Sequence, residues 1–221
     1  MTVRMQGRLA GLIYLGVVLT GVFTLAYVPG RLMTSDDPAA IAESLSSNAA
    51  LFGAANIAAL AMVGFFLALP FALAGFLAAY GKRAAMLMIL FVAASVPFSL
   101  AAIMQHFDLA SMTTGGSADP KAVAALVDGY DRWMNLASIF WGLWLAPLGW
   151  LILKSGAVPR ALGALLILGC LGYLIKYFGP LLYDGYDEIP FRRLISLPGS
   201  VGEIGLCIWL LIVGAREPVR N

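Results

Sequence analysis

Long apolar runs separated by short polar segments dominate the pattern of the chain. An α-helix of about 20 apolar residues crosses a hydrocarbon layer of roughly 30 Å. The pattern therefore predicts six membrane-spanning helices, at approximately residues 9–28, 51–80, 84–107, 134–153, 161–182 and 194–213. The second is longer than a straight crossing needs and contains Pro70, so we expect tilt or a kink there.

The fourth and fifth predicted helices form a hairpin that orients the others. The turn between them carries Lys154 and Arg160 and no acid, which predicts a cytoplasmic position. The other helices then alternate in direction, and both termini are cytoplasmic. Eight cations fall on the predicted inside and five on the predicted outside, namely Arg4, Arg8, Lys82, Arg83, Lys154, Arg160, Arg216 and Arg220 against Arg31, Lys121, Arg132, Arg192 and Arg193. This bias agrees with the assigned orientation.

Two of the predicted outer segments also have helical periodicity. Asp36-Asp37-Pro38 and Asp119-Pro120 each combine an acidic cap with a proline in the first turn. The apolar residues that follow at near-helical spacing are Ile41, Leu45 and Phe52 in the first segment and Val123, Leu126, Val127 and Tyr130 in the second. We therefore expect two amphipathic helices on the outer membrane surface.

The composition supports an all-α integral membrane protein, with residues 1–221 forming a single transmembrane domain. The chain is 61% hydrophobic and only 12% charged, whereas soluble domains carry about 25% charged residues. The net charge of +2 is small and the cations are dispersed, which argues against nucleic-acid binding. Cys170 and Cys207 both lie in apolar runs, so we expect two small buried hydrophobic side chains and no disulfide.

Two ionisable residues, Lys176 and Glu203, lie inside predicted spans. Counted at 1.5 Å per residue, both lie about 10–14 Å below the outer surface. A charge in the bilayer costs at least a few kcal/mol, so we expect the two side chains to face each other. Such a pair is either an interhelical lock or a ligand or proton site. Alternatively, the long stem of Lys176 extends its ammonium to the interface.

Other polar and aromatic side chains cluster in the same predicted outer half. We predict an outward-opening pocket lined by Asn56, His106, Asn135, Trp141, Lys176 and Glu203. His106 is the single histidine, with interfacial bonding, general-base and metal-ligand roles all open. Trp141 and Trp144 either pack against neighbouring helices or wall an apolar pocket. No cysteine–histidine set has zinc spacing and no phosphate-binding glycine loop occurs, so we predict no metal and no cofactor.

Several segments carry a family resemblance, and the turn at residues 155–163, Ser-Gly-Ala-Val-Pro-Arg-Ala-Leu-Gly, is the most distinctive. The others are residues 8–15, 20–21, 140–143, 148–151, 171–174, 197–198, 202–203 and 209–211. With these segments the chain resembles the bacterial DUF4386 family of polytopic membrane proteins. The resemblance implies a six-helix, multi-pass protein of the bacterial inner (plasma) membrane, and it implies no established activity.

Three functions fit these features. The leading hypothesis is a protein that binds an apolar or amphipathic ligand, or a membrane partner or second copy, through the outward pocket. The second is a membrane enzyme that acts on a lipid-like substrate with Glu203 or His106 as acid–base. The third is a small proton-coupled transporter in which Glu203 titrates. Membrane lipids are the surrounding partner in all three, and whether the chain is an enzyme stays open.

Overall fold

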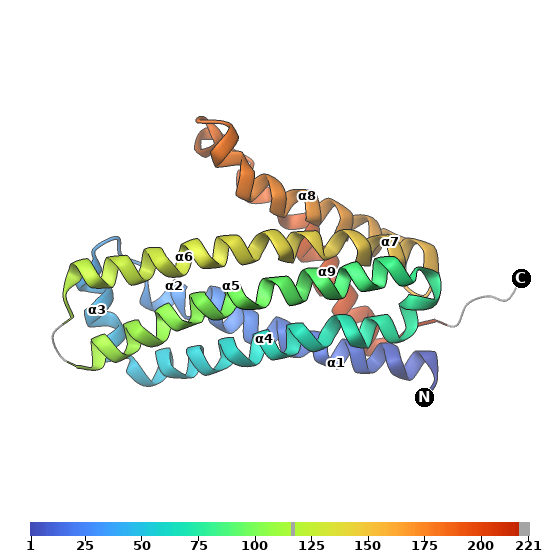
Figure 1. The fold of residues 1–221 in the computed structure, drawn as a ribbon, viewed down its shortest axis with the longest axis horizontal. Coiled ribbons are helices and arrows are strands. Elements are labelled where there is room, and N and C mark those ends of the chain that lie inside the picture. Colours follow the sequence, from blue (N-terminus) through green and yellow to red (C-terminus); the bar gives the residue numbers. More distant parts are fainter. Residues whose placement is uncertain (116–117, 217–221) are drawn as a thin grey trace, which may run out of the picture. The chain divides into compact units, whose positions relative to one another are not determined.

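The computed structural model describes residues 1–115 and 118–216, and within these residues the regular elements are helices, with no strand (Figure 1). The chain forms two compact units. The first unit comprises Met1–Leu15, Phe66–Ser95 and the residues from Ala137 onward. The second unit comprises Gly16–Phe65 and Val96–Leu136. Arg220, one of the cations predicted to be cytoplasmic, lies outside the described residues.

Five helical stretches are long and apolar enough to cross a membrane. They are α1 (Val3–Val22) continued by the π-helix η1 (Phe23–Tyr27) and α2 (Pro29–Leu32), α4 (Ala49–Leu77) continued by η2 (Ala78–Tyr80), α5 (Lys82–Thr114), α6 (Pro120–Leu143) continued by α7 (Leu145–Ser155), and α8 (Arg160–Leu182). Each contains one of the first five predicted spans, so the all-helical prediction is confirmed, and the length and composition of these helices indicate a multi-pass membrane protein. The sixth predicted span corresponds to α9 (Leu197–Ile212), whose 16 residues extend about 24 Å.

The second predicted surface helix is not a separate element. Pro120 begins α6, which continues without interruption to Leu143 and so includes the start of the fourth predicted span. No glycine or proline occurs between Asp131 and Leu136 to end the helix. The break comes instead at Trp144, because Pro147 lacks the N–H that would bond the carbonyl of Leu143.

A helix, α3 (Pro38–Ser47), forms in the segment where the first surface helix is predicted. Asp37 caps it, with its side chain accepting a hydrogen bond of 3.0 Å from the backbone N–H of Ala39. Its apolar side joins a buried cluster in the second unit that contains Val28, Leu32, Ile41, Leu45, Phe52, Ala55, Leu109 and Val123. The near-helical spacing of Ile41, Leu45 and Phe52 therefore reflects a core that α3 shares with α4.

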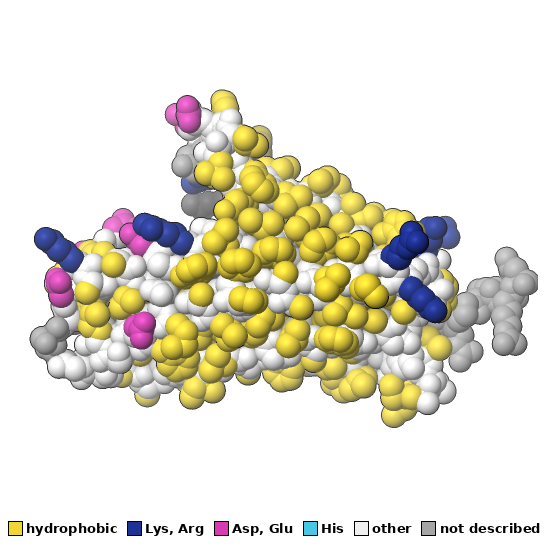
Figure 2. Space-filling model, in the orientation of Figure 1, with side chains coloured by type: hydrophobic (Ala, Val, Ile, Leu, Met, Phe, Trp, Pro, Cys, Tyr) yellow, Lys and Arg dark blue, Asp and Glu magenta, His cyan; other side chains and the backbone are white. Residues whose placement is uncertain are grey.

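In the first unit, α7 packs on α8 and α8 packs on α9 (Figure 1). Gly156, with φ of 63°, ends α7 and opens the predicted turn to α8. The contact between α8 and α9 is close enough that a Cβ on Gly169 would collide with the Cα of Gly199. Elsewhere α8 exposes large hydrophobic side chains, among them Leu168, Leu171, Ile175 and Phe178. Such a surface is typical of a helix that faces lipid. Figure 2 shows that hydrophobic side chains dominate the visible face of the molecule.

Two small polar clusters

The six residues predicted to line one pocket divide between the two units. Asn56, His106 and Asn135 belong to the second unit, and Trp141, Lys176 and Glu203 belong to the first. Each unit therefore has its own candidate site, and we describe the two sites separately.

In the second unit, the structure brings Asn56 and His106 together. The side-chain Nδ2 of Asn56 on α4 donates a hydrogen bond of 3.2 Å to the backbone carbonyl of His106 on α5. Asn56 is 1% exposed and His106 is 8% exposed. The bond thus connects two helices at a buried point, where polar groups need partners. Asn135 is exposed and does not line this site.

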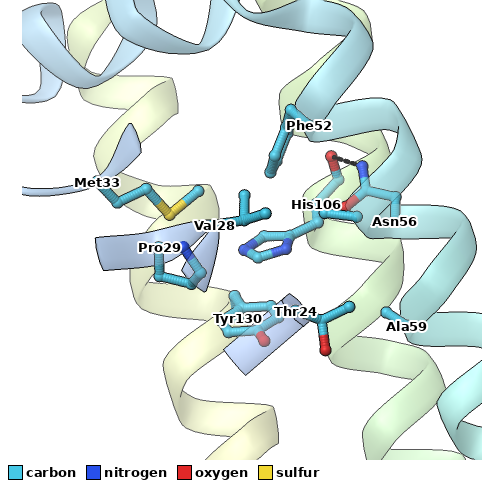
Figure 3. Close-up of a pocket in the computed structure, with 10 residues that line it drawn as sticks. Thr24, Val28, Pro29, Met33, Phe52, Asn56, Ala59, His106 and Tyr130 are labelled. Atoms are coloured by element: carbon cyan, nitrogen blue, oxygen red, sulfur yellow. Dashed lines mark hydrogen bonds between the residues drawn. The ribbon is translucent and has the colours of Figure 1, made fainter. Parts of the chain in front are cut away.

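Aromatic rings hold the imidazole of His106 on two sides (Figure 3). The ring of Tyr130 on α6 stacks on it, with centroids 3.6 Å apart and planes 3° apart. The ring of Phe52 on α4 lies 5.3 Å away at an angle of 59°. These contacts fix the plane of the imidazole while leaving its ring nitrogens without a hydrogen-bond partner among the described residues.

A small pocket adjoins the imidazole (Figure 3). Its lining is mostly apolar or aromatic and consists of Thr24, Val28, Pro29, Met33, Phe52, Ala55, Asn56, Ala59, His106 and Tyr130. The free space is about 10 Å³, enough for roughly one water molecule. A neutral imidazole offers one N–H donor and one acceptor. The pocket therefore combines apolar walls with an unpaired polar group.

The irregular end of the first membrane helix shapes one wall of this pocket. In η1 the backbone N–H of Val28 bonds the carbonyl of Phe23 at 3.0 Å, a spacing of five residues. The wider π turn carries Thr24, whose side chain is buried and lines the pocket together with Val28. Single π turns inside α-helices are frequent at functional sites. Sequence reasoning missed Thr24 and Tyr130, although the periodic positions after Pro120 include Tyr130.

In the first unit, Glu203 pairs with a residue that was not predicted. The phenol of Tyr14 on α1 donates a hydrogen bond of 3.2 Å to Oε1 of Glu203 on α9. Lys176 is exposed on α8 and makes no ion pair with Glu203. The expectation that Lys176 and Glu203 face each other is therefore wrong.

The register between α8 and α9 explains this correction. Gly169 lies opposite Gly199, and Gly202 lies against Leu165 and Leu166. Glu203 is therefore level with the residues near Leu165, whereas Lys176 is about 15 Å further along α8. At the level of Lys176, α9 has not yet begun, because Gly172 already contacts the carbonyl of Ile195.

The predicted mid-span tryptophans pack into an aromatic group beside Tyr14. Trp144 is fully buried and lies edge-on to Tyr14, with centroids 6.3 Å apart, and to Phe66, with centroids 5.2 Å apart. Trp141 lies edge-on to Phe66 at 6.2 Å. The indole N–H groups of Trp141 and Trp144 are buried without a hydrogen-bond partner. Of the two interpretations, the contacts favour packing between helices.

Cysteines and acids supply no metal centre within the described part of the chain, where no three His, Cys, Asp or Glu side chains come together. Cys170 and Cys207 are both buried and free. The thiol of Cys207 instead contacts the backbone carbonyl of Gly11 on α1 at 3.8 Å.

Comparisons with known proteins give a family and one relative. The family model described as "Domain of unknown function (DUF4386)" matches residues 9–214. An uncharacterized protein of the archaeon Archaeoglobus fulgidus is 37% identical over 84 residues, which are 38% of this chain and 47% of that protein. The chain thus spans about half the length of this relative. No solved structure matches the chain significantly.

Proposed function

The chain belongs to the DUF4386 family, and we propose that it is a multi-pass protein of the plasma membrane that binds the polar end of a small amphipathic molecule beside His106. The family assignment and the five long apolar helices support the membrane class. The family has no known function, so the proposal rests on the geometry of the pocket.

The observation that carries the proposal is the unpaired imidazole of His106. The ring nitrogens have no hydrogen-bond partner among the described residues, and a hydroxyl, carboxyl or water bound in the adjoining pocket would supply one. The apolar lining, including Val28 and Phe52, would accept the hydrocarbon part of such a molecule. Because the present space fits about one water, a larger ligand requires movement of a flexible wall residue, and Met33 is the best placed.

We also propose six spans with both termini in the cytoplasm. This proposal counts α9 as a sixth span, although its 16 residues are fewer than the about 20 that a crossing usually needs. Close packing on α8 and the cation bias of the connecting segments support it. The exposed apolar side of α8 would contact lipid, another membrane protein or a second copy.

The single histidine makes the binding proposal directly testable. Untagged protein with ¹³C-labelled histidine, reconstituted in lipid nanodiscs, gives one imidazole signal. We expect this signal to shift saturably when dodecanol or dodecanoic acid is added, and to stay in place with dodecane, which has no polar end. A response to neither amphiphile, or an equal response to dodecane, would contradict the proposal.

A pair of matched variants tests whether the shift of the His106 signal arises from binding in this pocket. Ala59 lines the pocket, so Ala59→Leu should fill the free space and abolish the saturable shift while leaving His106 in place. Ala61 lies on the same helix but is exposed, so Ala61→Leu should bind like the wild type. Equal binding by the two variants would place the ligand elsewhere.

A membrane enzyme is the alternative that the same observation favours. An imidazole with free ring nitrogens is able to exchange a proton with a lipid-like substrate. In that case the protein converts a lipid added to the nanodiscs, and His106→Gln lowers the rate by roughly 10²-fold or more. Saturable binding without conversion supports the binding function instead.

A further inference from the structure

We propose that Glu203 is a proton-binding site within the first unit, separate from the histidine pocket and independent of its function. The carboxyl lies in the middle of the apolar helix α9 and receives one hydrogen bond, from the phenol of Tyr14. No lysine, arginine or histidine forms an ion pair with it among the described residues. A proton is the ligand that such a carboxyl takes up most readily.

The groups around the carboxyl supply no compensating positive charge. Tyr14 faces it from α1, and Tyr173 on α8 is close enough to interact with it electrostatically. Cys207, one turn along α9 from Glu203, is a titratable neighbour of Tyr14. All three are neutral in their protonated forms. An ionised carboxylate here would rely on a single neutral donor, at a cost of several kcal/mol in a membrane interior.

The geometry accommodates both protonation states. In the ionised state, Tyr14 donates its proton to Oε1 of Glu203. In the neutral state, Oε1 still accepts that bond while the added proton resides on Oε2. As a residue, Glu203 is only partly buried in its unit. Proton binding and release at this point would therefore change one charge between α1 and α9 without breaking their contact.

Infrared spectroscopy of the full chain in nanodiscs tests this directly. We expect the difference spectrum between acidic and alkaline buffer to contain the carbonyl-stretch band of a protonated carboxylic acid in an apolar environment. Glu203→Gln should lose this band completely, and Glu203→Asp should retain it if the shorter side chain still folds into the bundle. A wild-type spectrum in which no such band depends on residue 203 would overturn the proposal.

The variant Tyr14→Phe gives an independent check. It keeps the buried ring but removes the donor that favours the ionised carboxylate, so the band should persist into more alkaline buffer. A structural role for Glu203 alone would leave this titration unchanged. Trp144→Phe, which alters the ring next to Tyr14 and leaves the hydrogen bond in place, should titrate like the wild type.

Chemical labelling identifies the residue. Dicyclohexylcarbodiimide adds across one of its C=N bonds to a protonated carboxyl, whose proton passes to a reagent nitrogen, and the adduct rearranges to a stable N-acylurea with no leaving group. Mass spectrometry should find this adduct on Glu203, decreasing roughly tenfold for each pH unit above the midpoint of titration. An infrared band without an adduct would still support proton binding, whereas labelling that persists undiminished in Glu203→Gln would place the reactive acid elsewhere. The His106 signal serves as an internal control, because it reports the other site.

Discussion

The imidazole of His106 and the phenol ring of Tyr130 lie flat against each other, 3.6 Å apart and within 3° of parallel. The two residues come from different helices, α5 and α6, within the second unit. The stack fixes the plane of the imidazole and closes one side of the pocket. It therefore links the packing of two helices to the polar group on which the proposed binding function depends.

Removing the stacked ring should disturb both stability and the histidine signal. Tyr130→Ala deletes an aromatic pair worth about 1 kcal/mol and leaves a cavity that adds to the loss. We expect the ¹³C signal of His106 to shift and broaden as the imidazole gains alternative orientations. Tyr130→Phe keeps the ring and should retain a sharp signal. A sharp, unshifted signal in Tyr130→Ala would show that the stack does not orient the imidazole.

The interhelical bond of Asn56 should contribute measurably to folding. Asn56→Ala removes the donor to the His106 carbonyl and leaves a small cavity, which should lower the free energy of unfolding by about 1–2 kcal/mol. This change is measured by unfolding the protein in mixed detergent micelles, with steric trapping as the readout. Ile57 is the adjacent residue and is 67% exposed, so Ile57→Ala is the matched control, expected within about 0.5 kcal/mol of wild type.

Close backbone contact between α8 and α9 makes Gly169 intolerant of a side chain. Gly169→Val would force the helices apart at Gly199, and we expect destabilisation of at least about 1–3 kcal/mol. Gly64 on α4 has open space where a Cβ would point, so Gly64→Ala should be neutral or stabilise the helix by up to about 1 kcal/mol. Comparable losses in the two variants would mean that α8 and α9 do not touch in the membrane.

Single cysteines test the proposed orientation. In a background with Cys170→Ala and Cys207→Ala, the variant Lys121→Cys should react with a membrane-impermeant maleimide on intact cells. The variant Lys82→Cys should react only after the membrane is made permeable, because Lys82 belongs to a predicted cytoplasmic turn. The reverse pattern would invert the proposed topology while leaving both candidate sites unchanged.

The helices were predictable because the signals that specify them are local. Apolar runs, the Asp37 cap and Gly156 all act within a few residues, and the structure contains the corresponding elements. The separate helix expected after Pro120 is wrong, because the polarity of the chain changes near Trp133 without any change of backbone conformation. The backbone of α6 stays helical through this region, and the helix ends only where Pro147 removes a hydrogen bond.

The candidate sites were less predictable because they depend on register between distant segments. Counting residues from the ends of spans gives depth, but it does not specify which residues on α8 and α9 are opposite each other. Gly169 and Gly199 set that register, and it places Glu203 away from Lys176. The residue that hydrogen-bonds Glu203 is instead Tyr14, which lies 189 residues earlier in the sequence. Tyr14 carries no charge from which a pairing with Glu203 would be predicted.

The meeting of Gly169 with Gly199 has a consequence for biosynthesis. In the folded protein, lipid acyl chains have no room between the two backbones at Gly169 and Gly199. During translation, the side of α8 that carries Gly169 has no native neighbour until α9 has been synthesised. If α9 is the sixth span that we propose, its docking on α8 adds van der Waals attraction to the hydrophobic transfer of α9 into the bilayer. Membrane insertion of α9 would then be coupled to its assembly with α8.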